Sequence, residues 1–350
     1  MEKFSKIIVT GADGWLGMGL LERLAKESKK KDSIYYKNEI IAFVQADTLK
    51  KKFKELEIKV IVGDLRNEED INKLLQNSEE ALVFNLAGII HPNFLSQRDF
   101  NKVNHLAMTS FANKSAKKGI KKFVAMSSNS PCGYSKNTFT RFDENSKYSP
   151  YMGYGSSKMK MEKNIILLSA QTKKTNFSIV RSPWFYGPHQ PHRQTQFFSL
   201  IKNGSFPLVG EGKSMRSMGY IDNLVEGLIL VSQYFDTNGE IFWISDKDPY
   251  SFYEIVMTVK KLLSNEFGFK IIDRQIYLPS IVSDIAQYSD YVFQKLGIYF
   301  QKVHVLSEMN QTIACDINKA ENLLGYAPKI KLEEGMRRSI KWCIDNGRKI

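Results

Sequence analysis

The 350-residue sequence has few cysteines and no long apolar run, and each shortage excludes a class of protein. Its three cysteines, Cys132, Cys315 and Cys343, are too few and too scattered for a disulfide framework or a zinc cluster. We therefore expect a reducing compartment and no bound metal. No stretch reaches the roughly 18 uninterrupted apolar residues of a spanning helix, so we expect no transmembrane segment.

The sequence also leaves no room for a secretory signal before its first apolar strand, Lys6–Thr10, and we expect a cytoplasmic protein. The most apolar late segment, Ile281–Phe300, is interrupted by Asp284, Asp290 and Lys295. We interpret it as an amphipathic helix that packs on the protein or on a partner, with contact to a membrane surface as the alternative.

Positive charge is in excess, with 50 Lys and Arg against 37 Asp and Glu, a net charge of +13. Nucleic-acid binding would require lysines grouped with aromatic residues in one stripe. The lysines instead form short, dispersed runs typical of solvated surfaces. We therefore expect no nucleic-acid partner. The runs are Lys29–Lys31, Lys50–Lys52, Lys117–Lys118 and Lys121–Lys122.

Short apolar runs alternate with helical patterns through the first half of the chain, which predicts an α/β fold with a doubly wound parallel sheet. The expected strands are Lys6–Thr10, Glu39–Val44, Lys59–Val62, Ala81–Asn85, Lys122–Met126, Phe177–Val180 and, later, Ile241–Ile244. The expected helices are Trp15–Lys26, Glu68–Gln76, Val103–Lys118 and Ser156–Ser169.

The composition changes near residue 182. Residues 183–215 are rich in proline and glycine, and mixed α/β patterns follow. We expect residues 1–182 to form a dinucleotide-binding, Rossmann-type domain and residues 183–350 a smaller α/β substrate-binding part, some of whose segments return to the sheet.

Three glycines, Gly11, Gly14 and Gly17, directly follow the first strand and open the first helix, with Trp15 and Leu16 among them. A dinucleotide needs such a tight turn, because its pyrophosphate approaches the backbone closely and binds the free N–H groups of a helix N-terminus. The position of this motif at the first strand predicts a dinucleotide site.

Residues after the next strands support a dinucleotide site. The Asp64 carboxylate can accept a hydrogen bond from adenine, and small residues after the fourth strand let a cofactor lie against the backbone. The residues assigned to these roles are Asp64, Leu65, Leu86, Ala87 and Gly88.

The residue that ends the second strand usually contacts the ribose. Here it is Gln45, which can bind a hydroxyl but has no charge to select between cofactors. Lys50–Lys52 could attract a 2′-phosphate, although we interpret them as a solvated helix face. We expect NAD, with NADP as the alternative.

Tyr154 and Lys158 are four residues apart, so a helix places them on one face. A free tyrosine, with a pKa of about 10, is a poor base near neutrality. A nearby ammonium lowers that pKa, and the tyrosine can then exchange a proton with a substrate hydroxyl.

Further polar residues are expected beside this pair. Ser127 and Ser128 end the fifth strand, where a hydroxyl can orient a substrate oxygen. Asn104 is expected to open a helix after the fourth strand and to hold a water or a backbone carbonyl near Lys158.

Together these motifs resemble the extended short-chain dehydrogenase/reductase family, in its NAD(P)-dependent epimerase/dehydratase and 3β-hydroxysteroid dehydrogenase-like group. The resemblance covers nearly the whole chain in order. Its segments are TGADGWLG (10–17), GDL (63–65), NLAG (85–88), VN (103–104), MSSNSPCG (126–133), YGSSK (154–158), RSPWFYGP (181–188), RSMGYIDN (216–223) and LGYAPKIKLEEGM (324–336).

The resemblance implies an enzyme with a catalytic triad of Ser128, Tyr154 and Lys158, with Ser128 preferred over Ser127. It also implies that Pro183 lines the nicotinamide side, and that the protein is a homodimer through two helices, one of which carries Tyr154.

Departures from the family pattern concern the substrate. Asn129 follows Ser128 where similar dehydratases carry Asp-Glu, so dehydration is not expected. Trp184 stands where nucleotide-sugar epimerases usually carry Asn, which favours an apolar hydroxy or keto substrate, with a steroid-like compound as one candidate. Arg216, at a diphosphate-binding position, is retained and favours a nucleotide sugar. We assign Asn129, Trp184 and Arg216 to substrate binding.

Residues 189–194 contain two histidines separated by a proline, and we interpret them as a substrate loop in which Arg193 meets an anion, with no metal bound. The leading hypothesis is an NAD(P)-dependent oxidoreductase acting on a secondary alcohol or ketone. A nucleotide-sugar epimerase of the same fold and a non-catalytic NAD(P)-sensing protein are the alternatives.

Overall fold

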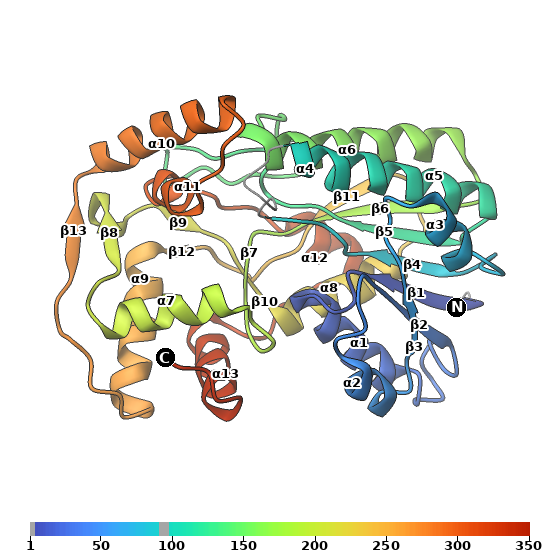
Figure 1. The fold of residues 1–350 in the computed structure, drawn as a ribbon, viewed down its shortest axis with the longest axis horizontal. Coiled ribbons are helices and arrows are strands. Elements are labelled where there is room, and N and C mark those ends of the chain that lie inside the picture. The colour runs from blue at the N-terminus through green and yellow to red at the C-terminus, as the bar shows by residue number, and fades with distance from the viewer. Residues whose placement is uncertain (1–3, 91–97) are drawn as a thin grey trace.

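The computed structural model describes residues 4–90 and 98–350. Its central sheet has seven parallel strands in the order β11-β6-β5-β4-β1-β2-β3 (Figure 1). This order is that of a Rossmann-type, doubly wound sheet with one further strand, and it confirms the expected fold class. The strands are β1 (Lys6–Thr10), β2 (Glu39–Val44), β3 (Lys59–Val62), β4 (Leu82–Asn85), β5 (Lys122–Met126), β6 (Asn176–Arg181) and β11 (Glu240–Trp243).

Helices cover both faces of the sheet, because successive strand residues are apolar and point to opposite sides. In β1, Ile7 and Val9 enter one core cluster and Ile8 enters the other. One face is covered by α1 (Trp15–Glu27), α2 (Lys50–Glu55), α8 (Ile221–Ser232) and α12 (Asn318–Leu324), and the other by α3 (Glu68–Leu74), α5 (Met108–Lys118) and α6 (Met152–Gln171).

The chain after residue 183 contributes both to the central sheet and to a second, smaller part of the molecule. β11 pairs in parallel with β6, so this late strand lies at the edge of the central sheet. A separate core cluster, which contains Tyr186, Phe198 and Met336, takes its buried residues from β7 (Trp184–Tyr186), α7 (His192–Lys202), β8 (Pro207–Val209), β10 (Met218–Tyr220), α9 (Phe252–Lys261), η4 (Leu262–Glu266) and α13 (Leu332–Asp345). The remaining late elements are η3 (Gly210–Gly212), β9 (Met215–Arg216), β12 (Tyr250–Ser251), β13 (Ile276–Leu278), α10 (Ser280–Lys295) and α11 (Gln301–Glu308).

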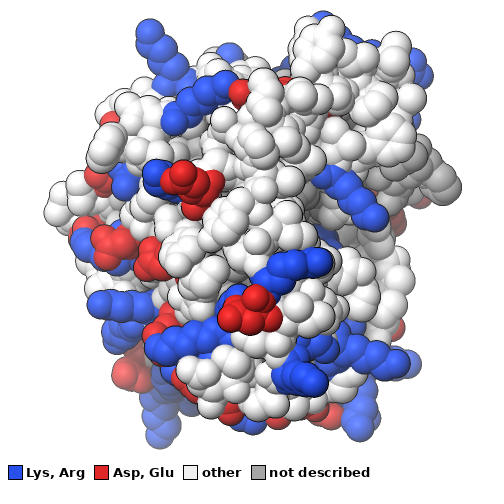
Figure 2. Space-filling view, turned by 90° about the vertical axis from the view of Figure 1, so that its left-hand side faces the viewer, with Lys and Arg blue, Asp and Glu red and all other residues white. Residues whose placement is uncertain are grey.

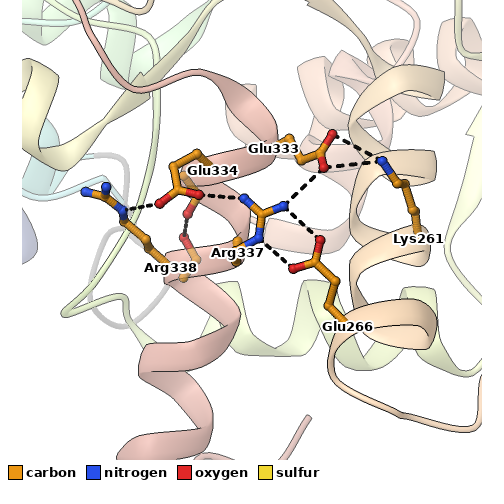
Figure 3. A network of polar contacts seen from close by, with 8 residues as sticks. Lys261, Glu266, Glu333, Glu334, Arg337 and Arg338 are labelled. Carbon is orange, nitrogen blue, oxygen red and sulfur yellow. Dashed lines mark hydrogen bonds and ion pairs between the residues drawn. The ribbon is translucent and has the colours of Figure 1, made fainter.

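A network of charged side chains joins α13 to the end of α9 and to η4 (Figure 3). Arg337 donates to both oxygens of Glu266, at 2.6 and 2.8 Å, and also contacts Glu333 and Glu334. Lys261 contacts Glu333 at 3.2 Å. Because these groups are exposed, the network orients α13 more than it stabilises the fold.

Two sequence-based interpretations were wrong. Residues 192–194 of the expected 189–194 loop form the first turn of helix α7, whose N-cap is Pro191. Asn104 does not open a helix, because helical structure already begins at α4 (Arg98–Phe100) and Asn104 lies within the π-helix η2 (Asn101–Ala107).

The predicted segment Ile281–Phe300 is helical only as far as Lys295. Gly297, with a φ of 81°, turns the chain into α11. Within residues 4–90 and 98–350, no helix is both long enough and apolar enough to cross a membrane.

Candidate active site

The predicted site residues gather at the carboxyl edge of the parallel sheet. Gly11 follows β1, Gln45 follows β2 and Leu86 follows β4. Ser128 lies two residues after β5, and Pro183 lies between β6 and β7. In a doubly wound sheet this edge forms the ligand crevice.

The turn after β1 is as close-packed as a pyrophosphate loop requires. Gly14 N–H donates to Gly11 O at 3.1 Å, and Gly11 has a φ of 63°. A Cβ at Gly11 would lie 2.8 Å from the Ala87 backbone, and one at Gly17 would lie 2.2 Å from Gly11 O. No side chain caps α1 and no acidic residue stands in its first turn, so its N-terminus is open to an anion.

Trp15 and Thr10 connect this turn to its surroundings. The Trp15 indole donates to Pro188 O at 2.6 Å and packs edge-on against Phe185. Thr10, which the sequence analysis missed, accepts from Ala87 N–H and donates to Asn85. It holds the loops after β1 and β4 together.

Gln45 and Asp64 lie side by side, because the amide of Gln45 donates to the Asp64 carboxylate at 3.3 Å. Arg66 also contacts that carboxylate, and its hydrogen bonds lower the pKa of Asp64 despite partial burial. Leu65 is buried next to them. The arrangement offers an amide and a carboxylate on the side expected for adenosine.

Asn104 is fully buried and holds the loop after β4. Its Oδ1 accepts from Ile89 N–H and its Nδ2 donates to Ile89 O, both at 2.8 Å. A Cβ at Gly88 would lie 3.1 Å from Asn104 Oδ1 and 3.4 Å from Lys158 Nζ. Asn104 therefore holds a backbone carbonyl close to the lysine, from a π-helical turn of the kind often found at functional sites.

The structure brings Tyr154, Lys158 and Ser128 together. Tyr154 and Lys158 both lie in α6, and Lys158 Nζ donates to Met126 O at 2.9 Å, at the end of the strand that leads to Ser128. Burial raises the pKa of Tyr154 to about 12, and a side-chain hydrogen bond with Ser128 opposes that rise. Burial lowers the pKa of Lys158 to about 8, against the opposing effect of the Glu162 carboxylate.

A buried ion pair, which no sequence motif predicted, includes Glu162 on the same helix as Tyr154 and Lys158. Glu162 and Arg181 are 0% and 1% exposed, and their side chains meet at 2.8 Å. The Glu162 carboxylate also accepts from Tyr148 at 2.8 Å and from Ser127. The sequence signals for this pair were only a glutamate one helical turn after Lys158 and an arginine at the end of an apolar strand.

The residues predicted to bind substrate do not share one environment. Trp184 packs against Phe197 and Phe252, and its indole donates to Gln194. Arg193 is exposed in the first turn of α7. Asn129 lies beside Ser128, whose hydroxyl contacts the Asn129 amide at 3.3 Å.

Arg216 is buried, lies over the ring of Phe252 and donates to the backbone carbonyl of Glu308. Its Nε has no hydrogen-bond partner among the described residues. Burial lowers its pKa, although an arginine stays charged near neutrality. One donor of a buried cation is therefore unused.

Aromatic rings cover Tyr154. Phe100 packs 5.7 Å from the ring of Tyr154 and 6.1 Å from that of Tyr299, between ring centroids. Tyr299 lies between α10 and α11, so this helical hairpin reaches the site. In the part of the chain that the structure describes, no group of three or more His, Cys, Asp and Glu side chains could hold a metal.

A model of the NAD dependent epimerase/dehydratase family matches residues 7–245. An uncharacterized protein of Sinorhizobium fredii, y4nL, is 41% identical over 97% of this chain and 96% of its own length. The 3beta-hydroxysteroid-dehydrogenase/decarboxylase isoform 1 of Arabidopsis thaliana is 23% identical over 81% of this chain and 66% of its own. The crystal structure of UDP-glucuronic acid 4-epimerase from Bacillus cereus in complex with NAD superimposes with a TM-score of 0.74 at 22% identity, covering 98% of this chain and all of that one.

Proposed function

The chain belongs to the NAD-dependent epimerase/dehydratase family, a family of enzymes, and from that premise we propose that it is an NAD-dependent oxidoreductase. It transfers hydride at the carbon of a secondary alcohol or ketone, and Ser128, Tyr154 and Lys158 are its catalytic residues. The observation that carries this proposal is the convergence of these three side chains at the carboxyl edge of the sheet.

The residues of the site fit a bound NAD. Gly11, Gly14 and Gly17 provide a turn that a Cβ would block, and the open helix N-terminus would bind the pyrophosphate through the backbone at Trp15 and Leu16. Further contacts would come from Gln45, Asp64, Leu65, Leu86, Ala87, Gly88 and Pro183. When bound, NAD supplies the hydride acceptor or donor.

The protein residues supply the proton chemistry. With a pKa raised by burial, Tyr154 is neutral at pH 7 and can donate its proton to a ketone oxygen. In the opposite direction Tyr154 must act as a base, and its hydrogen bond with the Ser128 hydroxyl favours the phenolate. A nearby ammonium such as that of Lys158 favours the phenolate as well. Since the pKa of Lys158 is about 8, this lysine is mostly cationic at pH 7.

The substrate part of the site favours an apolar hydroxy or keto compound. Trp184, Phe197 and Phe252 form a connected aromatic cluster, and Arg216 is held against it through Phe252. Such clusters bind apolar ligands and use a few polar groups to orient them. The similarity to a 3beta-hydroxysteroid dehydrogenase agrees with a steroid-like substrate.

The unused donor of Arg216 favours a second candidate, a nucleotide-sugar epimerase. A diphosphate could accept a hydrogen bond from the buried Nε–H. The likeness to the Bacillus cereus epimerase in complex with NAD agrees with this alternative. In an epimerase the hydride returns to the other face of the same carbon, and no reduced cofactor is released.

One assay distinguishes the dehydrogenase from the epimerase. The purified protein is incubated with NAD and a panel of secondary alcohols, steroids and nucleotide sugars. Net NADH release identifies a dehydrogenase, whereas conversion of a nucleotide sugar without NADH release identifies an epimerase. Absence of turnover across the panel contradicts both.

We place the reaction in the cytoplasm, where the three free, buried cysteines would stay reduced.

A further inference from the structure

The hairpin of α10 and α11 has an unusual outer surface. Eight of its side chains are large, apolar and exposed, among the twenty such side chains in the described residues. Tyr288 is 72% exposed and Leu296 is 70% exposed. We call this set the hairpin face: Ile281, Ile285, Tyr288, Tyr291, Leu296, Ile298, Phe300 and Val305.

Helix α10 presents its apolar side outward and its polar side inward, the reverse of an ordinary surface helix. Ile281, Ile285 and Tyr288 follow a spacing of four and three residues, which places them on one exposed side. The buried side carries Ser283, Ala286, Asp290 and Gln294 instead.

The inward polar side chains fix this orientation. Ser283 donates to Ser307 O at 2.9 Å. The buried Asp290 carboxylate accepts from Tyr151 at 2.9 Å and from Gln294 at 2.8 Å, and it contacts His304 at 2.9 Å. Turning the helix to bury its apolar side would break the three contacts that leave α10, those to Ser307, Tyr151 and His304, so the hairpin face is held outward.

The exposed charges on the hairpin face are positive. Lys295 and Lys302 are exposed, and Lys295 lies over the ring of Tyr291. Asp290 is buried, and Asp284 is paired with Lys136 at 2.9 Å. The face therefore combines aliphatic side chains, tyrosines and lysines, the composition of a surface that lies in a lipid headgroup layer.

A loop continues this surface. Lys136 attaches the segment around residue 139 to the start of α10, and the Phe139 ring at its tip is almost fully exposed. Figure 1 shows α10 along an outer edge of the molecule with no other element above it. In Figure 2, charged side chains crowd the lower half of the face in view, and broad uncharged areas lie toward its top.

We propose that the hairpin face docks on the surface of an anionic lipid bilayer and lies in its headgroup region without crossing it. A second copy of the chain fits the face less well. A two-fold interface would place the face against itself and bring Lys295 and Lys302 toward their own copies, while the Asp284 carboxylate on α10 is already paired with Lys136. Anionic lipid headgroups complement the same lysines.

Vesicle co-sedimentation of the full chain tests this proposal. Vesicles of phosphatidylcholine with about one third phosphatidylserine should bind the wild type, and added salt should weaken binding by screening the lysines. The double variant Ile285→Asp/Tyr288→Asp should bind at least about tenfold less, because two inserted apolar side chains become charged. The matched control is Tyr253→Asp/Ile344→Asp, which changes two exposed apolar residues on α9 and α13 and should bind like the wild type.

Circular dichroism shows whether each variant is folded. The variant Lys295→Glu/Lys302→Glu leaves the apolar residues intact and should also bind anionic vesicles less than the wild type, because its charges repel the headgroups. Failure of the wild type to bind, or equal loss in the control, overturns the proposal. The proposal is also overturned if the wild type does not bind vesicles but self-associates, and if Ile285→Asp/Tyr288→Asp abolishes that self-association. The hairpin face would then be covered by a second copy of the chain. None of these measurements requires turnover.

Discussion

Glu162 lies one helical turn beyond Lys158, and its carboxylate joins three elements around the triad. It contacts Arg181 at the end of β6, Ser127 next to Ser128, and Tyr148 in the loop before α6. Because these contacts are buried, Glu162 holds the serine strand and the lysine helix at a fixed separation. We propose that it is a positioning residue.

The variant Glu162→Gln tests this role. Loss of the carboxylate charge should lower the pKa of Lys158 below its value of about 8, because Glu162 raises it. The alkaline limb of kcat/KM should then move to lower pH, since the ammonium form of Lys158 is lost earlier, and kcat/KM at pH 7 should fall roughly tenfold.

Ser127→Ala is the matched control, because it removes one hydrogen bond to Glu162 and keeps the charge. An alkaline limb at the same pH in Glu162→Gln and in the wild type would exclude the role. An unpaired buried Arg181 costs about 3–5 kcal/mol, so Glu162→Gln/Arg181→Met provides a better-folded second variant.

The structure shows which elements the sequence could predict. Strands buried on both faces produce continuous apolar runs, and their observed bounds differ from the expected ones by at most one residue at either end. Helix α7 was missed because Pro188 and Pro191 precede it, and η2 because a π-helical turn has no distinctive sequence pattern. The expected helix ran on to Phe300 because apolar residues continue on both sides of Gly297, whereas α10 ends at Lys295 and the chain turns at that glycine.

The site was predictable where its residues share a short motif. The glycine turn and the Tyr154–Lys158 pair are local in sequence, so their spacing together with their place relative to the predicted strands and helices was enough to single them out. The Glu162–Arg181 pair joins residues that are 19 positions apart, and Tyr299 reaches the site from 145 positions beyond Tyr154. Only the fold brings such residues together.

The contact between α10–α11 and α6 depends on a histidine. Burial lowers the pKa of His304, and the carboxylates of Asp290 and Glu308 more than compensate, so its pKa is above the ordinary value. Tyr151 and Tyr299 pack against its ring. The charged form is therefore favoured in the folded protein, and its stabilising contribution is present below a pH of about 6.5 and lost as pH rises through the folded pKa.

Thermal unfolding of the wild type and His304→Gln across this range measures the contribution. The midpoint of the wild type should fall more between pH of about 6 and about 9 than that of the variant, because the neutral glutamine has no charge to lose. Parallel pH profiles for the two proteins would show that the histidine carries no such contribution.

At the scale of the whole molecule, the exposed apolar residues on η2 and α6 favour a homodimer. Leu106 is 53% exposed and Leu167 is 61% exposed, on neighbouring helices of the face opposite α1. We propose that these helices pair with their copies, which would build the dimer around the helix that carries Tyr154.

Light scattering with size-exclusion chromatography tests the dimer. The wild type should have twice the mass of the chain, and Leu167→Arg should have the mass of one chain, because a charge buried without a partner opposes association. Leu323→Arg changes a comparably exposed leucine on α12 and should remain dimeric. A monomeric wild type, or a dimeric Leu167→Arg, refutes this assembly.

The central claim is that Tyr154 exchanges the proton during NAD-dependent hydride transfer. Its most direct test compares NADH formation by the wild type and Tyr154→Phe with the best alcohol of the panel, together with NAD binding by fluorescence titration. We predict a loss of rate of about 100-fold or more in Tyr154→Phe, since a general acid–base is removed, with NAD affinity within about threefold of the wild type. An unchanged rate in Tyr154→Phe would contradict the account.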